Sequence, residues 1–242
     1  MANGKMTSSA MNSITLVGIS DLHGHLPDLD KLPNGDVLCI CGDIVPLDVQ
    51  NHFRESISWL GQTFLPWVED TPYDHVILIG GNHDKVLDTV YTETDVIREM
   101  LVPPTKLYYL MDSGIVIDGW NFWGTPWCPH LKNWAFYACH DELVEKFGNI
   151  PDDADILLTH CAPKIMDYGV SLDHIGLGRV DYGCQELAEA IKEKKPRASL
   201  FGHIHSGDHR PKEIEGTTYC NVSLLNEMYR PAFKPTVLTI NK

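Results

Sequence analysis

No apolar run in the 242-residue sequence approaches the ~20 residues that a membrane-spanning helix requires. The first dozen residues are small and polar around a single Lys, and they lack the apolar centre of a signal peptide. The sequence also contains no internal repeat or low-complexity linker that would divide it. We therefore expect residues 1–12 to be a disordered leader, residues 13–242 to form a single domain, and no membrane to be a partner.

Basic residues are few. The chain has 33 acidic and 19 basic residues, for a formal net charge of −14. Affinity for nucleic-acid polymers comes mainly from Lys and Arg that neutralise phosphates, so such a polymer is not expected as a partner. A small phosphorylated substrate held by metal ions is compatible with this charge.

Paired cysteine motifs are also missing. The seven cysteines are an odd number and include no repeated CxxC pair, which argues against a disulfide framework or a structural thiolate zinc site. Cys39 and Cys41 lie inside an apolar run, where a free cysteine behaves as a small apolar residue. Reduced thiols and a cytoplasmic location are the expectation.

Five apolar runs of strand length each stop at residues that bind metals. The runs span residues 14–20, 36–42, 75–81, 155–159 and 198–202. They lead into Asp21-Leu22-His23, Asp43, Asn82-His83-Asp84, His160 and His203-Ile204-His205. Short apolar runs bounded by Gly and polar residues are typical of buried strands, and ligands of open α/β sheets bind beyond the carboxyl ends of the strands. The pattern predicts one rim rich in Asp, His and Asn.

The remaining pattern predicts an α/β protein. Apolar residues at helical spacing predict a helix over residues 49–69. Further helices are predicted over 94–101, 134–147 and 184–194, and short strands over 107–111, 115–117, 121–124, 217–223 and 237–240. Parallel-type strands with crossover helices, followed by antiparallel strands, favour two packed sheets with helices outside.

The residue types at the rim suit a pair of metal ions. Asp21 and His23 point to the same side of an extended segment and can hold one ion together, and His203 and His205 can do so if their segment curves. Carboxylate, imidazole and amide ligands suit manganese, iron or zinc. Asp43 follows Gly42, which permits a sharp turn, and its carboxylate can bridge two ions. Two ions roughly 3.5–4 Å apart would share a hydroxide that attacks phosphorus in line.

His83 and Asp84 are the predicted catalytic residues. If Asn82 coordinates an ion, His83 is left either to protonate the leaving-group oxygen or to hydrogen-bond the phosphoryl group. Neighbouring cations disfavour a protonated His, so this form needs support. Asp84 is the nearest acidic residue in sequence.

The order Asp-x-His, Gly-Asp, Gly-Asn-His-Asp, a lone His after a strand, and Gly-His-x-His resembles the calcineurin-like metallophosphoesterase superfamily over residues 21–205. The resemblance implies a four-layer α/β/β/α sandwich, with two mixed β-sheets flanked by helices. It implies two divalent ions, with manganese as the first choice and iron or zinc as alternatives. One ion would be held by Asp21, His23, Asp43 and His205, and the other by Asp43, Asn82, His160 and His203.

A closer likeness lies outside the metal blocks. The segments 124–127, 159–163 and 219–223 resemble the brain-protein type of metallophosphoesterase-domain-containing proteins, which are similar to class III cyclic-nucleotide phosphodiesterases. Some members of that group are weakly active because the first His of Gly-His-x-His is lost. His203 is present here, which favours an active phosphodiesterase on a small nucleotide-like substrate.

One position departs from the superfamily pattern. An acidic residue commonly follows the bridging Asp by three positions and supports the catalytic His in protein phosphatases, but Pro46 stands here. Asp48 and Asp84 are the candidates to replace it. The alternative functions are a broad phosphomonoesterase or nucleotide pyrophosphohydrolase, and a non-catalytic protein-binding module, which would be expected to have damaged ligands.

Three further residues are candidate substrate contacts. His25 is two residues beyond His23, with a solvated loop position as the alternative. His130 lies in a Trp-rich loop whose aromatic residues either stack a nucleobase or belong to the core. Arg179 lies in a Gly-rich stretch and would clamp a phosphate, unless it has a surface role.

Overall fold

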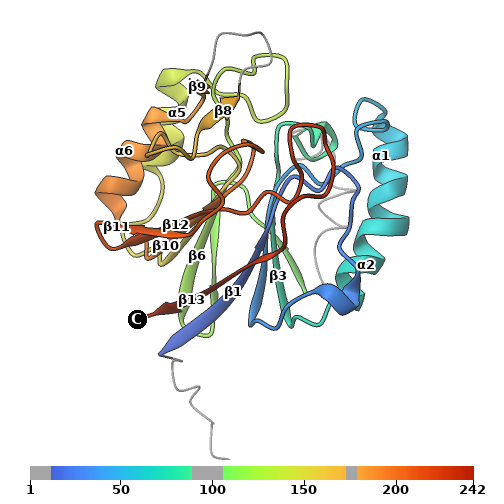
Figure 1. Ribbon diagram of the computed structural model, residues 1–242, viewed down its shortest axis with the longest axis horizontal. Coiled ribbons are helices and arrows are strands. Elements are labelled where there is room, and N and C mark those ends of the chain that lie inside the picture. Colours follow the sequence, from blue (N-terminus) through green and yellow to red (C-terminus); the bar gives the residue numbers. More distant parts are fainter. Residues whose placement is uncertain (1–11, 89–105, 173–178) are drawn as a thin grey trace, which may run out of the picture.

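The computed structural model describes residues 12–88, 106–172 and 179–242. Within these residues two mixed β-sheets pack face to face, and helices cover the outer side of each sheet (Figure 1). This four-layer α/β/β/α arrangement confirms the predicted fold class. Of the expected leader over residues 1–12, all but Asn12 lies outside the described residues.

The first sheet supplies the first three predicted strands. It has the order β13-β1-β2-β3-β4. Its strands are β1 (Ser13–Ile19), β2 (Val37–Cys41), β3 (His75–Ile79), β4 (Leu107–Tyr109) and β13 (Thr236–Asn241). Strands β1 to β4 are parallel, and β13 pairs antiparallel with β1 at the edge. Every residue of β2 is buried, as expected for a central strand covered on both faces.

The second sheet supplies the other two metal-block strands and has the order β11-β12-β10-β7-β6-β5. Its strands are β5 (Ser113–Ile117), β6 (Trp120–Thr125), β7 (Ile156–Thr159), β10 (Ala198–Phe201), β11 (Lys212–Ile214) and β12 (Thr217–Asn221). The four central strands are parallel, and β5 and β11 are antiparallel edges. A separate hairpin of β8 (Val170–Leu172) and β9 (Arg179–Asp181) was not predicted, nor was β11.

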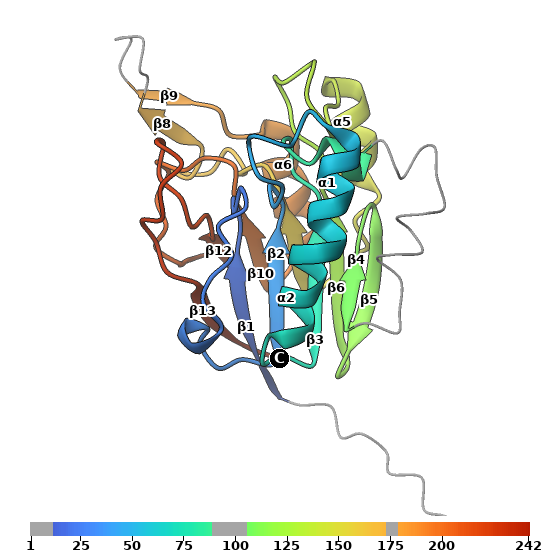
Figure 2. The same cartoon turned by 90° about the vertical axis from the view of Figure 1, so that its right-hand side faces the viewer.

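The outer helical layers follow the predicted apolar stripes. The helix predicted over residues 49–69 is confirmed as α1 (Phe53–Trp59), a π-helical turn η2 (Leu60–Phe64) and α2 (Leu65–Asp70), and it lies over the first sheet (Figure 2). Pro66 has no N–H to donate, which accounts for an irregular turn just before it. Over the second sheet lie α5 (His140–Gly148) and α6 (Gln185–Lys194), and a short 3₁₀ turn η1 spans Leu29–Lys31.

The helix predicted over residues 134–147 is wrong in its first part, because α5 begins only at His140. Phe136 has a positive φ of 52° that breaks a helix, and its carbonyl oxygen accepts a hydrogen bond from the Cys128 N–H at 2.8 Å. The preceding segment therefore pairs with residue 128 instead of coiling. The helix predicted over residues 94–101 lies outside the described residues.

Packing between the sheets decides where the site lies. Residues of both sheets, including Leu16, Ile77, Leu158 and Leu200, form one fully buried layer. Parallel pairing brings the carboxyl ends of β1, β2 and β3 to one edge of the first sheet, and those of β7 and β10 to one edge of the second. The two edges meet at the same end of the molecule, the upper end in Figure 1, where His160 after β7 reaches the Cys41 carbonyl oxygen of β2.

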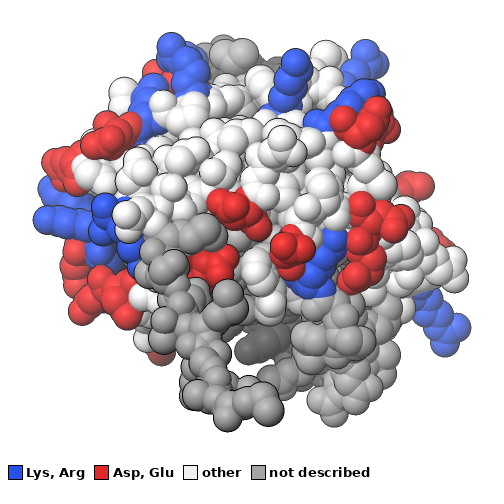
Figure 3. Space-filling model, turned by 90° about the horizontal axis from the view of Figure 1, so that it is seen from below, with Lys and Arg blue, Asp and Glu red and all other residues white. Residues whose placement is uncertain are grey.

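The face seen from the opposite end carries mixed charge. Among the described residues on it, Lys and Arg side chains lie beside Asp and Glu side chains and do not form a stripe (Figure 3). None of the helices in the described part of the chain has both the length and the apolar character that crossing a membrane demands.

Candidate metal centre

The metal-binding residues predicted at the strand ends come together from both sheets. Within the described residues, Asp21, His23 and His205 form a group whose ligand atoms lie within 4.8 Å of one another. Asp21, Asp43 and His160 form a second such group. The shared Asp21 carboxylate places the two groups side by side.

The backbone at these positions adopts an uncommon conformation. Asp21, His23, Asp43 and His203 have φ angles of 54°, 42°, 55° and 69°, all in the left-handed region. Gly42 has a φ of 90°, and a Cβ atom there would lie 2.6 Å from the Gly80 carbonyl oxygen. Non-glycine residues avoid this region, and such strain concentrates at functional sites.

Asp21 is the hub of the first ligand group and is fully buried. Its Oδ2 accepts hydrogen bonds from Ser223 Oγ at 2.6 Å and from the His203 N–H at 2.9 Å. His205 Nε2 lies 3.2 Å from Asp21 Oδ1, and His205 Nδ1 lies 3.0 Å from the Asn226 carbonyl oxygen. A carbonyl that accepts from Nδ1–H fixes the ring and directs Nε2 towards the centre, as is common for metal-ligating His.

His23 provides the test of whether an ion fits. Both of its ring nitrogens are buried and have no hydrogen-bond partner. Burial lowers the pKa of His23 to about 4, although Asp43 acts in the opposite direction, so the ring is neutral at pH 7. Unpaired buried polar atoms cost free energy, and a neutral imidazole beside two carboxylates suits a divalent cation. The residues present therefore fit a metal ion.

The second ligand group is centred on His160, which is fully buried. Its Nδ1 lies 2.7 Å from the Cys41 carbonyl oxygen, and its Nε2 lies 2.9 Å from Asn82 Oδ1 and 3.3 Å from Asp43 Oδ2. The His203 ring centroid is 5.1 Å from that of His160. Asp43, Asn82 and His160 are therefore in mutual reach, and His203 lies beside the His160 ring.

Protons occupy part of this centre when no ion is bound. Burial opposes protonation of His160, but Asp43 outweighs it and raises the pKa to about 9. His205 behaves in the same way beside Asp21, with a pKa raised to about 9. Burial acts to raise the pKa values of Asp21 and Asp43, yet the neighbouring His side chains hold both below the usual range. Cation binding should therefore release protons from the two imidazoles.

His83 faces the same centre and forms, with His23 and Asp43, a further group whose ligand atoms lie within 4.8 Å of one another. Its Nε2 lies 3.9 Å from Asp43 Oδ2, and its Nδ1 lies 2.5 Å from Gln50 Oε1. The rings of Trp134 and Tyr229 pack against it, with centroids at 4.4 Å and 6.2 Å. Burial lowers the pKa of His83, with Asp43 acting in the opposite direction. The Nδ1–H donates to the Gln50 amide oxygen, which leaves Nε2 directed at the space beside Asp43.

Asp84 does not support the His83 ring, which corrects the sequence-based expectation. Asp84 Oδ1 accepts hydrogen bonds from the backbone N–H groups of Ile44 and Val45 at 2.9 and 3.0 Å, and Oδ2 accepts one from the Gly81 N–H at 2.9 Å. The tight turn over residues 81–84 folds this carboxylate back onto the backbone, and burial raises its pKa to about 7. Gln50, and neither Asp48 nor Asp84, is the residue that supports the His83 ring.

The family comparison agrees with this geometry. The model of the calcineurin-like phosphoesterase family matches residues 14–207, which contain all seven predicted ligands and His83. The chain belongs to the calcineurin-like phosphoesterase family. It is therefore a metal-dependent phosphoesterase, and the family resemblance stated from the sequence is confirmed.

Similar sequences and a similar solved structure are consistent with this family assignment. Human metallophosphoesterase domain-containing protein 1 is 30% identical over 244 residues, covering 93% of this chain and 70% of that protein. The UPF0046 protein T07D4.2 of Caenorhabditis elegans is 30% identical and covers 80% of this chain. Phosphopantetheinyl hydrolase from Mycobacterium tuberculosis shares the fold, with a TM-score of 0.58, 15% identity, and coverage of 90% of this chain and 92% of that one.

Of the predicted substrate contacts, His130 shares a pocket with a predicted metal ligand. It lines a pocket of about 380 Å³ together with His203, and Ser171, Tyr182 and Glu227 also line that pocket. His130 has a φ of 69°, so its backbone conformation is also uncommon.

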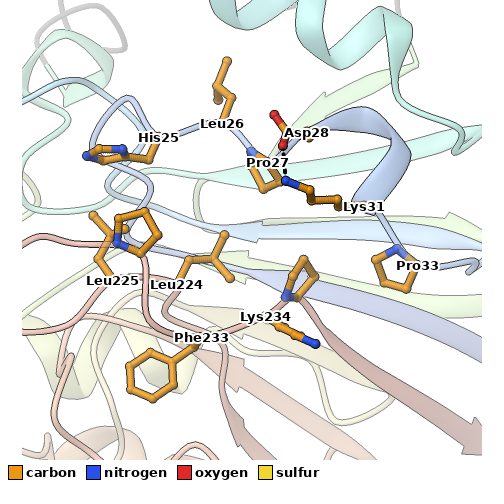
Figure 4. Close-up of a pocket in the computed structure, with 12 residues that line it drawn as sticks. His25, Leu26, Pro27, Asp28, Lys31, Pro33, Leu224, Leu225, Phe233 and Lys234 are labelled. Carbon is orange, nitrogen blue, oxygen red and sulfur yellow. Dashed lines mark hydrogen bonds and ion pairs between the residues drawn. The ribbon is translucent and has the colours of Figure 1, made fainter.

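His25 lines a different pocket, of about 700 Å³ (Figure 4). Leu26, Leu224, Leu225 and Phe233 make much of its wall apolar, and the Lys31 ammonium pairs with Asp28 at its edge. Arg179 lies on β9, where its exposed guanidinium is 3.5 Å from Asp167 Oδ1. It lines neither pocket, so we do not include it in the site.

Sequence reasoning missed several residues that shape this phosphoesterase site. Gln50, Ser223 and Tyr229 hold His83, Asp21 and the His23 ring, respectively, and no metal block contains them. Ser223 ends a segment that the sequence marks as a strand and by its family likeness but not as part of the site, and nothing near Gln50 in sequence marks it. Chain folding alone brings these residues to the centre.

Proposed function

We propose that this phosphoesterase is a two-metal phosphodiesterase that acts on a small nucleotide-like diester. The observation that carries the proposal is the position of Asp43. Its Oδ2 lies 3.7 Å from His23 Nε2 and 3.3 Å from His160 Nε2, and His83 Nε2 lies 3.9 Å from the same oxygen. A carboxylate placed in this way suits a bridging role, in which both ions share it.

The chain's own residues would hold the ions in two sets. Asp21, His23, Asp43 and His205 would hold one ion, and Asp43, Asn82, His160 and His203 the other. Manganese, iron and zinc suit these ligands, with manganese as the first choice. When bound, such ions activate a water molecule for in-line attack on phosphorus and neutralise charge on the phosphoryl oxygens.

His83 is the proposed general acid. With Nδ1–H donated to Gln50, a protonated His83 presents Nε2–H to the leaving-group oxygen beside Asp43. The Gln50 amide oxygen keeps the ring in this orientation in both protonation states. Asp84 has a positioning role, because it joins the backbone that carries Asp43 to the backbone that carries His83.

The preference for a diester rests on the resemblance of segments 124–127, 159–163 and 219–223 to proteins that are similar to class III cyclic-nucleotide phosphodiesterases. The pocket with His130 includes His203 and would receive one organic group of the substrate. A phosphomonoesterase or nucleotide pyrophosphohydrolase is the second candidate, because it would use the same ions.

Hydrolysis of bis-p-nitrophenyl phosphate and p-nitrophenyl phosphate by metal-stripped and manganese-loaded protein tests the proposal. We expect no diester turnover without metal and recovery with manganese. Asp43→Asn should abolish the recovery, whereas Asp118→Asn, at an exposed turn, should not. Monoester turnover far above diester turnover would contradict the phosphodiesterase assignment. Fewer than two bound ions in the presence of excess manganese would favour a non-catalytic module.

A further inference from the structure

One buried cysteine lies against the second ligand group. Cys128 follows β6, and its Sγ lies within 4.8 Å of a ring nitrogen of His160 and one of His203, which are also within 4.8 Å of each other. In the described part of the chain, no other cysteine belongs to a metal-binding group of this kind. The placement of this sulfur at the centre requires an explanation.

The backbone fixes Cys128 in this position. Its N–H donates to the Phe136 carbonyl oxygen at 2.8 Å, and its own carbonyl oxygen accepts from the Ala138 N–H at 3.2 Å. The residue is fully buried. Its thiol lies 3.7 Å from the Pro126 carbonyl oxygen and is hydrogen-bonded to the Cys161 side chain. Hydrogen bonds of a thiol are weak, so the sulfur can exchange these contacts for a neighbouring cation.

The dimensions suit coordination. An ion about 2.3 Å from sulfur and about 2.0–2.1 Å from imidazole nitrogen can join atoms up to roughly 4.4 Å apart. The observed spacing of up to 4.8 Å closes with a small movement of the side chains. His203 forms its three-membered group with Cys128 and His160 and not with Asp43. The sulfur therefore completes a ligand group around His203 that the carboxylate does not.

We propose that Cys128 is a sulfur ligand of the second ion, beside His160 and His203. The inference rests on the proposed two-ion centre. On binding, the S–H bond breaks, the proton passes to solvent, and a sulfur–metal bond forms. Thiolate is a soft ligand that selects zinc or iron over manganese. The two ion positions would therefore differ, with a manganese-type set of O and N ligands at the first and a softer set at the second.

Cobalt(II) titration of the metal-stripped, reduced protein tests this inference by absorption spectroscopy. Cobalt–imidazole coordination gives visible bands, and a cobalt–thiolate bond adds a near-ultraviolet charge-transfer band. We expect both kinds of band in the wild type, and loss of only the charge-transfer band in Cys128→Ser. Cys220→Ser, which alters another buried cysteine, and Cys139→Ser, which alters an exposed one, should keep it. Cys128→Ser should also lower zinc affinity at one position by at least about tenfold.

The wild-type spectrum decides the question even if Cys128→Ser fails to fold. Visible cobalt bands without the charge-transfer band would overturn the sulfur ligand and leave the two-ion proposal intact. A charge-transfer band that persists in Cys128→Ser would also overturn it. If no cobalt binds at all, both proposals fail.

Discussion

The two sheets contribute to the metal centre in different ways. The loops of the first sheet are bonded to one another through their backbones, with the N–H groups of Asp21 and His23 donating to the carbonyl oxygens of Gly42 and Asp43 at 3.0 and 2.9 Å. Asp84 joins the third loop to the second. The second sheet instead supplies imidazoles that reach across, as His160 does when its Nδ1 lies 2.7 Å from the Cys41 carbonyl oxygen.

Backbone hydrogen bonds hold the first sheet's part of the centre, whereas side-chain contacts hold the second sheet's part. Backbone hydrogen bonds within the first sheet's loops fix Asp43 independently of any ion. The second sheet's imidazoles depend on side-chain contacts: His160 has three polar contacts, His205 has two, and the His203 ring lies against His160. Raised pKa values let protons take the place of cations at His160 and His205. We therefore expect changes in the first sheet's loops to affect folding, and changes in the second sheet's ligands to affect mainly metal content.

The largest effect is expected at Asp43, where the two halves meet. Asp43→Asn should lower kcat/KM for the diester by roughly 10³-fold or more, because a shared anionic ligand is lost and each 1.36 kcal/mol of the barrier is about tenfold in rate. His205→Ala should lower the metal content to about one ion per chain and change the free energy of unfolding of the metal-free protein only slightly. Metal analysis and steady-state kinetics of both variants check this. Retention of two ions by Asp43→Asn would contradict the bridging role.

Asp84 tests how strongly the loops of the first sheet are held together. Asp84→Ala leaves three buried N–H groups without an acceptor, so the free energy of unfolding should fall by about 3–9 kcal/mol, at about 1–3 kcal/mol for each group. Ser223→Ala removes a single hydrogen-bond donor to Asp21, so it should lower the free energy of unfolding by only about 1 kcal/mol. Urea unfolding of the metal-free proteins compares them. Equal losses would remove the distinction between the two halves.

Gln50 provides a smaller and more specific change. Burial lowers the pKa of His83, and a carboxylate at position 50 would raise it by favouring the imidazolium. If protonated His83 serves the leaving group, kcat falls as pH rises through this pKa. Gln50→Glu should then shift the alkaline limb of the kcat profile upward by roughly one pH unit. A profile identical to that of the wild type would exclude this role for His83.

The smallest effect is expected at His130, which lines the pocket but belongs to neither ion set. His130→Ala should raise KM for the diester about tenfold with little change in kcat, since it would remove binding common to substrate and transition state. His140→Ala, on the exposed side of α5, is the matched control. A loss confined to kcat would instead place His130 in the chemistry.

Local sequence determined the strands, the order of the metal blocks and the family. Runs of four to seven β-branched and aliphatic residues that end in Gly and polar residues are typical of buried strands, and β1, β2, β3, β7 and β10 lie within two residues of the predicted ends. The α5 boundary was missed because the apolar spacing over residues 134–147 satisfies a helix, whereas a tertiary pairing with Cys128 holds the first part in a loop.

Only the tertiary structure decided which side chains hydrogen-bond to or pack against the predicted metal ligands and His83. Gln50, Cys128, Ser223 and Tyr229 are far from the metal blocks in sequence or carry no pattern of their own, and packing of the two sheets brings them to one rim. Asp84 shows the limit most clearly, because its neighbour in sequence is His83 but its carboxylate turns to the backbone. The sequence alone determined the metal chemistry through residue type and strand-end position. Which groups support, orient and extend that chemistry depends on contacts between distant segments, which only the folded chain creates.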